Sequence, residues 1–216
     1  MIREKICLEF KSLDDISHLK IYEKFTDLME TQVVSDVLPK QYNFDTPFNA
    51  IISDRSEWFN VNLQMNSEDF VYFTDGSKKD NSVGAGVYGP SCRISKALGS
   101  AATVFQAEVH AIEICVDKCR RRNDIQNRKV YIASDSQAAI KALMSNQVTS
   151  KQILDYLNNL KTLAWICNLT LIWVPGHEEI DGNEKADELA RKGSETRFIG
   201  PEPFCGYGLS NFKLKL

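Results

Sequence analysis

The hydrophobic pattern changes its period along the chain, and each change predicts a different element. Apolar residues recur at near-helical spacing over residues 8–30, which indicates a helix. The β-branched and aromatic run Phe70-Val-Tyr-Phe-Thr-Asp75 predicts a strand that ends in a polar turn, followed by a loop over residues 76–82. Further strands are expected over residues 83–88 and 91–100, and the glycines of the first of these allow a neighbouring backbone or a ligand to approach closely.

Helical and strand patterns alternate in the second half of the chain. The predicted elements are a helix over 104–122, a strand over 130–135, helices over 136–144 and 151–166, a strand over 169–174, and a helix over 183–192 with Gly193 as its C-cap. Strands that first follow one another and then alternate with helices predict an α/β fold. We expect a mixed sheet of five strands, an antiparallel meander followed by parallel strands, with helices packed on it.

The net charge of −3 conceals an uneven distribution. Residues 1–68 carry 7 basic and 12 acidic side chains, whereas residues 69–193 carry 16 and 15. Together with the Asn-rich stretch 60–67, this shift predicts a domain over residues 69–193, between an N-terminal extension (1–68, partly helical) and a C-terminal tail (194–216). The net negative charge of the whole chain argues only weakly against nucleic-acid binding, because the predicted domain has a net charge of +1.

The apolar and cysteine patterns predict an intracellular protein, in the cytoplasm or the nucleus. No apolar run approaches the ~20 residues needed to cross a bilayer, and charges interrupt the N-terminal apolar residues, unlike a secretory signal. The six cysteines are scattered, and only Cys115 and Cys119 share a helix face. We therefore expect reduced thiols rather than disulfides or a zinc site.

Carboxylates stand at four positions that the predicted fold can bring together. Asp75 and Asp135 each end a strand, Glu108 lies on the apolar stripe of a helix, and Asp187 lies on the last helix. If the two strands are neighbours, their carboxylates lie side by side and repel one another unless a cation neutralises them. Four carboxylates can hold two hard divalent ions about 4 Å apart, an arrangement suited to phosphoryl displacement. Each residue alone has an ordinary alternative as a turn, cap or surface residue.

Five short motifs, in this order and spacing, make the segment from Phe70 to Gly193 resemble type 1 ribonuclease H. They are Thr74-Asp75-Gly76-Ser77, Gln106-Ala107-Glu108, Ser134-Asp135-Ser136-Gln137-Ala138, Val174-Pro175-Gly176-His177 and Asn183-Glu184-Lys185-Ala186-Asp187-Glu188-Leu189-Ala190. The Pro-Gly-His form and the helix end Ala190-Arg191-Lys192 resemble the ribonuclease H region of retrotransposon polyproteins, particularly of non-LTR elements. The trailing Gly200-Pro-Glu-Pro203 and the upstream extension are consistent with excision from such a polyprotein.

The resemblance implies a ribonuclease H-like fold and hydrolysis of the RNA strand of an RNA–DNA hybrid. It implies that two Mg²⁺ or Mn²⁺ ions are held by the carboxylates of Asp75, Glu108, Asp135 and Asp187. His177 would assist proton transfer or product departure. The resemblance also implies a reverse transcriptase domain or polyprotein as a partner, and it implies no membrane partner.

An enzyme that cuts RNA and spares DNA must sense the 2′-hydroxyl, which is accessible in the wide minor groove. The candidate contacts are Gly76, Ser77, Asn81, Gln106, Ser136 and Gln137. Each side chain among them is equally compatible with a turn or cap role.

The chain departs from many cellular relatives in one respect, because no basic protrusion is apparent between Asp135 and His177. The interval 140–172 contains only the basic residues Lys141, Lys151 and Lys161. The densest basic cluster, Lys118 with Arg120–Arg122, fits either a solvated helix end or a phosphate contact. Two alternative functions therefore stay open: a domain that binds hybrid without cutting it, and a structural support for a reverse transcriptase, to which residues 1–68 would attach.

Overall fold

A computed structural model of the protein describes residues 35–56, 58, 66, 68–176, 178–202 and 204–207. The helix predicted over residues 8–30 and His177 lie outside the described residues. In chain order the elements are β1 (Val37–Tyr42), β2 (Asn49–Ile51), β3 (Phe70–Lys79), β4 (Ser82–Gly89), β5 (Cys92–Gly99), α4 (Val104–Arg120), β6 (Lys129–Ser134), α5 (Gln137–Leu143), β7 (Gln147–Ser150), α6 (Lys151–Ala164), β8 (Asn168–Trp173) and α7 (Asp181–Glu195).

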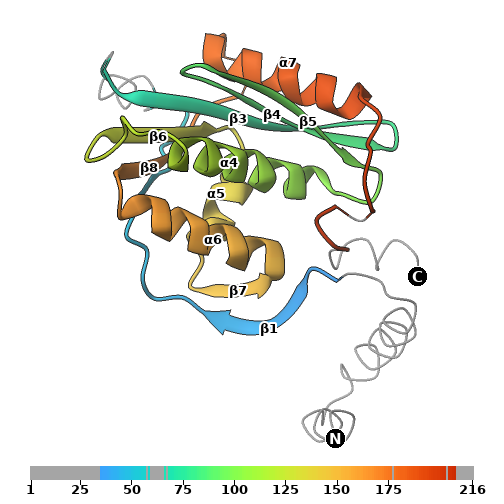
Figure 1. Ribbon diagram of the computed structural model, residues 1–216, viewed down its shortest axis with the longest axis horizontal. Coiled ribbons are helices and arrows are strands. Elements are labelled where there is room, and N and C mark those ends of the chain that lie inside the picture. Colours follow the sequence, from blue (N-terminus) through green and yellow to red (C-terminus); the bar gives the residue numbers. More distant parts are fainter. Residues whose placement is uncertain are drawn as a thin grey trace, which may run out of the picture.

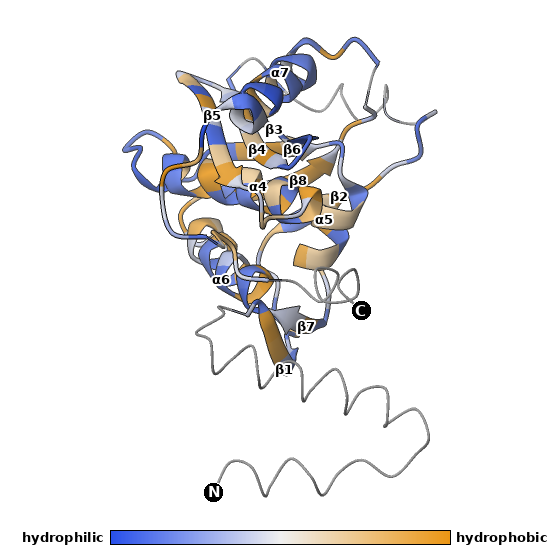
Figure 2. Cartoon of the chain, turned by 90° about the vertical axis from the view of Figure 1, so that its right-hand side faces the viewer, coloured by the Kyte–Doolittle hydropathy of each residue, from blue (hydrophilic) through white to orange (hydrophobic). Residues whose placement is uncertain are grey.

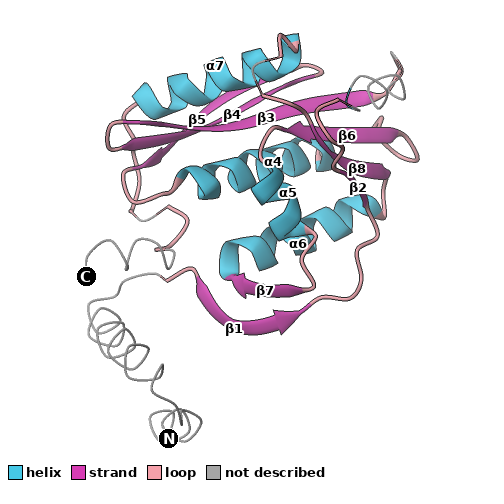
Figure 3. Cartoon of the chain, turned by 180° about the vertical axis from the view of Figure 1, so that it is seen from behind, coloured by secondary structure: helices cyan, strands magenta, loops and turns pink. Residues whose placement is uncertain are grey.

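The main sheet of the described part has the strand order β2-β8-β6-β3-β4-β5. Strands β3, β4 and β5 form an antiparallel meander, whereas β3–β6, β6–β8 and β2–β8 are parallel pairs. The predicted mixed sheet is therefore confirmed, but its strand number is wrong. The sheet has six strands rather than five, because the short strand β2 adds beside β8 at the edge (Figure 3).

Helices cover both faces of the sheet, with α4, α5 and α6 on one side and α7 on the other (Figure 1). Successive side chains of β6 alternate between the two faces of the sheet. Val130 and Ile132 enter the large core beneath α4–α6, and Tyr131 and Ala133 enter a second, smaller cluster. Figure 2 shows hydrophobic colour concentrated in the strands and the helices next to them, while α7 is largely hydrophilic. Helix α7 buries mainly small residues.

The glycines of β4 let α7 lie directly on the sheet, as their sequence pattern had allowed. A Cβ at Gly84 would lie 2.1 Å from the backbone nitrogen of Ser194, and one at Gly86 would lie 2.1 Å from the backbone oxygen of Ala186. The predicted C-cap at Gly193 is wrong, because α7 continues to Glu195. Gly193 instead lies inside the helix, where a Cβ would be 2.7 Å from the backbone oxygen of Lys96.

Strand β3 is longer than its hydrophobic run predicts. Residues 76–79 do not form a loop but pair with β4 as far as Lys79 and Ser82, and a turn of Asp80 and Asn81 joins the strands. The cross-strand backbone pairing, which side-chain hydrophobicity does not reveal, extends the strand through polar residues. Asp75 consequently lies within β3, opposite Gly86, rather than at its end.

Residues 35–56 and 58 share strands and core with the segment after residue 69. Strand β1 pairs with β7 in a separate two-stranded sheet, and β2 pairs with β8. Phe48 belongs to the large core and Trp58 to the small cluster. The domain boundaries given above stay a prediction.

The cysteines of the described part are free thiols, and Cys92, Cys115, Cys119 and Cys167 among them are buried. Within the described segments, no helix has both the length and the apolar character that a membrane crossing requires.

Candidate active site

Two parallel strands bring Asp75 and Asp135 together. Thr74 of β3 is in register with Ser134 of β6, so the residue after each stands at the same level of the sheet. The Thr74 hydroxyl donates to the backbone oxygen of Ala133 at 3.0 Å, and the Trp173 indole donates to the backbone oxygen of Asp135 at 3.0 Å. The predicted juxtaposition of the two strands is confirmed.

Helix α4 supplies the third carboxylate. A capping box of Thr103 and Gln106 begins the helix, and Glu108 follows within its first turns. A Cβ at Gly76 would lie 2.6 Å from the backbone nitrogen of Glu108, so glycine at this position lets α4 approach β3 closely. Gly76 thereby sets the position of Glu108.

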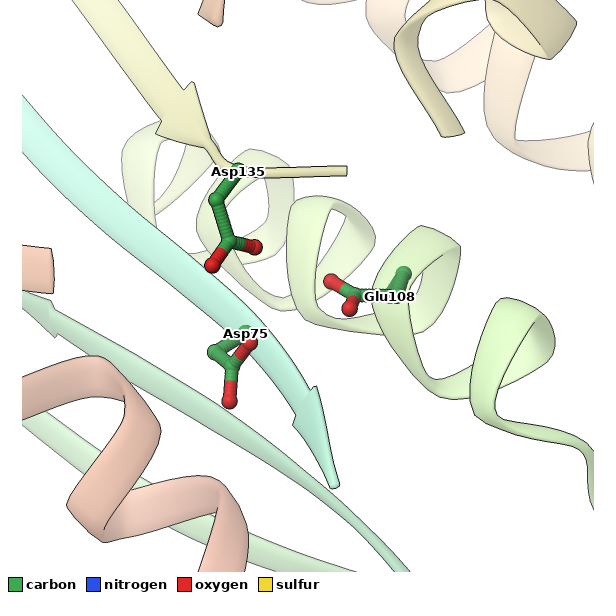
Figure 4. Close-up of side chains that lie close together, drawn as sticks. All are labelled: Asp75, Glu108 and Asp135. Atoms are coloured by element: carbon green, nitrogen blue, oxygen red, sulfur yellow. The ribbon is translucent and has the colours of Figure 1, made fainter. Parts of the chain in front are cut away.

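The carboxylates of Asp75, Glu108 and Asp135 point toward one another (Figure 4). One oxygen from each lies within 4.8 Å of the others. Asp75 and Glu108 are 7% and 8% exposed, and Oε2 of Glu108 has no hydrogen-bond partner among the described residues. We call these three residues the acidic cluster.

Burial makes negative charge costly in the acidic cluster. Burial, and then the charges of Asp135 and Asp187, raise the pKa of Asp75 to about 7. Burial, and then the charges of Asp75 and Asp135, raise the pKa of Glu108 to about 9. A buried carboxylate oxygen without a partner, beside two further carboxylates, is a donor set that suits a hard divalent cation.

Asp187 is near the acidic cluster but not part of it. Its charge contributes to the raised pKa of Asp75. Its carboxylate accepts a hydrogen bond from Arg191 at 2.6 Å, one turn along α7, and its side chain is 33% exposed. The spacing of four residues between Asp187 and Arg191 is the sequence signal from which this ion pair could be predicted.

The predicted substrate contacts fall into two groups. Ser136 and Gln137 directly follow Asp135, where Ser136 caps α5 and Gln137 accepts a hydrogen bond from Lys141 at 2.9 Å. Ser77 is half-buried within β3, next to Gly76. These residues lie beside the acidic cluster in the chain, so they stay candidates.

The structure places Gln106 in the interior and Asn81 in a turn, and a substrate contact of either residue stays a prediction. Gln106 is 3% exposed, and its amide is already bonded to Thr103 and to the backbone oxygen of Gly206. Asn81 lies in the turn that joins β3 to β4, six residues after Asp75 and beyond the end of β3 at Lys79. The loop that would have held Asn81 close to Asp75 is not formed.

The three lysines between β6 and α7 bond side chains within the described part of the chain. Lys141 bonds Gln137, Lys151 pairs with Asp155, and Lys161 bonds Asn43. Residues 140–172, all of which the structure describes, form α5, β7, α6 and β8 rather than a projecting basic helix.

The comparison with protein families decides the assignment. The family model for RNase H matches residues 67–195, a span that contains the acidic cluster, Asp187 and position 177. The chain belongs to the RNase H family. This membership indicates ribonuclease H activity, with RNA–DNA hybrid as substrate. The search of curated proteins found no match for this RNase H.

The raised pKa values predict how metal changes the stability of this RNase H. A carboxylate with a raised folded-state pKa stabilises the fold below its unfolded pKa, near 4, and this contribution is lost as pH rises through about 7 for Asp75 and about 9 for Glu108. A cation bound at the acidic cluster neutralises the carboxylates and prevents this loss of stability. We expect the melting temperature in Mg²⁺ to exceed that in EDTA by roughly 1 °C at pH 5.5 and by roughly 5–10 °C at pH 8.5.

Circular dichroism melting at both pH values, in EDTA and in about 5–10 mM Mg²⁺, measures this difference. Groups outside the acidic cluster, such as the buried Glu113, titrate equally in both buffers and cancel. A difference that does not grow with pH would contradict the assignment of the cation to these carboxylates.

Proposed function

We propose that the protein hydrolyses the RNA strand of RNA–DNA hybrids at the acidic cluster by a two-metal-ion mechanism. The observation that carries this proposal is the meeting of three carboxylates, those of Asp75 and Glu108 buried and that of Asp135 half-buried, within the segment that matches RNase H. Two Mg²⁺ or Mn²⁺ ions bound there would supply an activated water and stabilise charge on the leaving 3′-oxygen.

The residues of the chain have distinct roles in this proposal. Asp75, Glu108 and Asp135 would hold the ions, and burial of Asp75 and Glu108 keeps these two carboxylates in place. Asp187 completes the ligand set when its side chain leaves Arg191. His177 takes or gives a proton, since the ordinary pKa of histidine lies close to neutral pH.

The substrate is recognised from the minor groove of the hybrid, where the 2′-hydroxyl distinguishes RNA from DNA. Ser136 and Gln137, with the backbone near Gly76 and the hydroxyl of Ser77, are the proposed contacts. Hydroxyl and amide side chains can both donate to and accept from a 2′-hydroxyl.

We propose further that the protein is intracellular and derives from a retrotransposon polyprotein, in which a reverse transcriptase domain is its partner. The form of the Pro175-Gly176-His177 motif and the Gly200-Pro-Glu-Pro203 segment support this origin. Residues 69–193 would be the catalytic unit, with 1–68 as extension and 194–216 as tail.

One assay tests the proposed activity. The full chain is incubated with labelled RNA–DNA hybrid, duplex RNA and duplex DNA of one sequence, in Mg²⁺ and in EDTA. We expect cleavage of the RNA strand of the hybrid in Mg²⁺, and none of the other duplexes or in EDTA. Equal cutting of duplex DNA would contradict recognition of the 2′-hydroxyl. Firm binding of hybrid without cutting would favour the alternative of a domain that only binds it.

A further inference from the structure

The turn at residues 54–58 contacts the loop between β8 and α7, although the two lie far apart in sequence. Nη2 of Arg55 donates to the backbone oxygen of Gly176 at 3.1 Å, and Nε of Arg55 pairs with Oε1 of Glu178 at 3.2 Å. A guanidinium holds its donors in one rigid plane, so a single Arg55 side chain binds both partners at fixed separation. The contact thus links two points of this loop.

Packing anchors the same turn beneath the loop. Trp58 is 1% exposed and belongs to an apolar cluster with Val174, where the loop begins, and Ile180, where it ends. The Trp58 amide donates to the backbone oxygen of Asp54 at 3.2 Å and closes the turn that carries Arg55. Strand β2 just before this turn is itself paired with β8 (Figure 3).

The loop lies against the acidic cluster. A Cβ at Gly176 would be 2.9 Å from Oδ2 of Asp135, so the backbone of Gly176 borders that carboxylate. The loop also leads into α7 through its N-cap residue Ile180, and α7 carries Asp187. A change in the position of Gly176 therefore changes the space beside Asp135.

We infer that Arg55 is a positioning residue of the active site, which holds the β8–α7 loop in place beside Asp135. This inference rests on the proposed hydrolysis at the acidic cluster and adds to it a contribution from outside the segment that matches RNase H. Because the Arg55 side chain is 65% exposed, its ion pair contributes little to overall stability. Its loss should change the loop and the reaction rate without unfolding the protein.

The kinetic test compares full-chain Arg55→Ala, Arg55→Lys and wild type in the cleavage of hybrid. Loss of hydrogen bonds of this strength corresponds to about a 3- to 10-fold lower kcat for Arg55→Ala, with unchanged KM and a melting temperature within about 2 °C of wild type. Arg55→Lys keeps the charge but not the two-point contact, so its kcat should lie between the two. The control is Lys151→Ala, which removes an exposed ion pair with Asp155 on α6 and should keep the wild-type kcat.

A second readout does not depend on activity. Hydrogen exchange of the backbone amides at 176–180, measured in EDTA, should be faster in Arg55→Ala than in wild type and unchanged in Lys151→Ala. Unchanged exchange, or a wild-type kcat in Arg55→Ala, would overturn the inference. So would a raised KM at unchanged kcat, since that is the effect of a lost substrate contact. If wild type does not cut hybrid, the proposed function fails, while the exchange measurement still decides whether Arg55 holds the loop.

Discussion

Replacement of Glu108 by Gln should reduce the rate of hybrid cleavage by more than about 100-fold, because even outer-shell partners of metal ligands cost 10- to 100-fold. Gln preserves the size of the side chain but removes the negative charge and one ligand oxygen from the acidic cluster. Single-turnover cleavage of labelled hybrid in Mg²⁺ measures the effect.

Glu113→Gln is the matched control for this variant. Glu113 is also a buried glutamate of α4, and burial raises its pKa to about 8. Its partner is Asn159, which donates to it at 2.7 Å, and it lies outside the acidic cluster. We expect Glu113→Gln to cleave hybrid within about twofold of the wild-type rate. Burial alone does not make a glutamate part of the active site, which also requires the other carboxylates of the acidic cluster.

Stability separates loss of chemistry from loss of fold. Both glutamates have raised pKa values, so at pH 8 in EDTA both neutral variants should melt no lower than wild type. Wild-type cleavage by Glu108→Gln would remove Glu108 from the site. Equal losses in the two variants would mean that the rate depends on the packing of α4 rather than on the acidic cluster.

Replacement of Gly86 by Ala should destabilise the protein more than any surface change. The added Cβ would lie 2.1 Å from the backbone oxygen of Ala186 and 2.3 Å from the backbone nitrogen of Ala190, and neither atom can move without shifting α7. Overpacking of this kind against backbone costs about 3 kcal/mol or more, which corresponds to a melting temperature about 10 °C lower. Thermal melting of Gly86→Ala in EDTA checks this.

Ser82→Ala is a control in the same strand, because it adds no atom and should melt within about 2 °C of wild type. Since α7 carries Asp187, Gly86→Ala should also cleave hybrid more slowly below its melting temperature. A melting temperature like that of wild type would contradict the close packing of α7 on β4.

Much of the fold could be predicted from the sequence, where side-chain pattern alone decides the element. The buried stripe of α4 has helical spacing, and the apolar runs of β6 and β8 are bounded by polar residues, so these elements were predicted within a few residues. Strands β2 and β7 were missed because they have only 3 and 4 residues, and β1 was missed because Pro39 interrupts it. The extension of β3 past Asp75 depends on its pairing with β4, which no local pattern encodes.

The acidic cluster could be predicted because β3 and β6 are parallel neighbours, in which Asp75 and Asp135 follow the paired residues Thr74 and Ser134. Contacts between segments that lie far apart in the sequence could not be predicted. The amide of Gln106 is bonded to the backbone oxygen of Gly206, 100 residues further along the chain, and no local sequence pattern predicts this bond. Arg55 reaches Gly176 across 121 residues, and neither residue carries a sequence signal for the other.

The most direct test of the central claim uses a duplex in which one strand is DNA with a single short block of ribonucleotides and the other strand is DNA. Cleavage is mapped to the nucleotide for the wild-type protein, in Mg²⁺ and in EDTA. Hydrolysis at the acidic cluster with recognition of the 2′-hydroxyl predicts cuts only within the ribonucleotide block, and only in Mg²⁺. Cuts outside the block, or cuts that persist in EDTA, would contradict it.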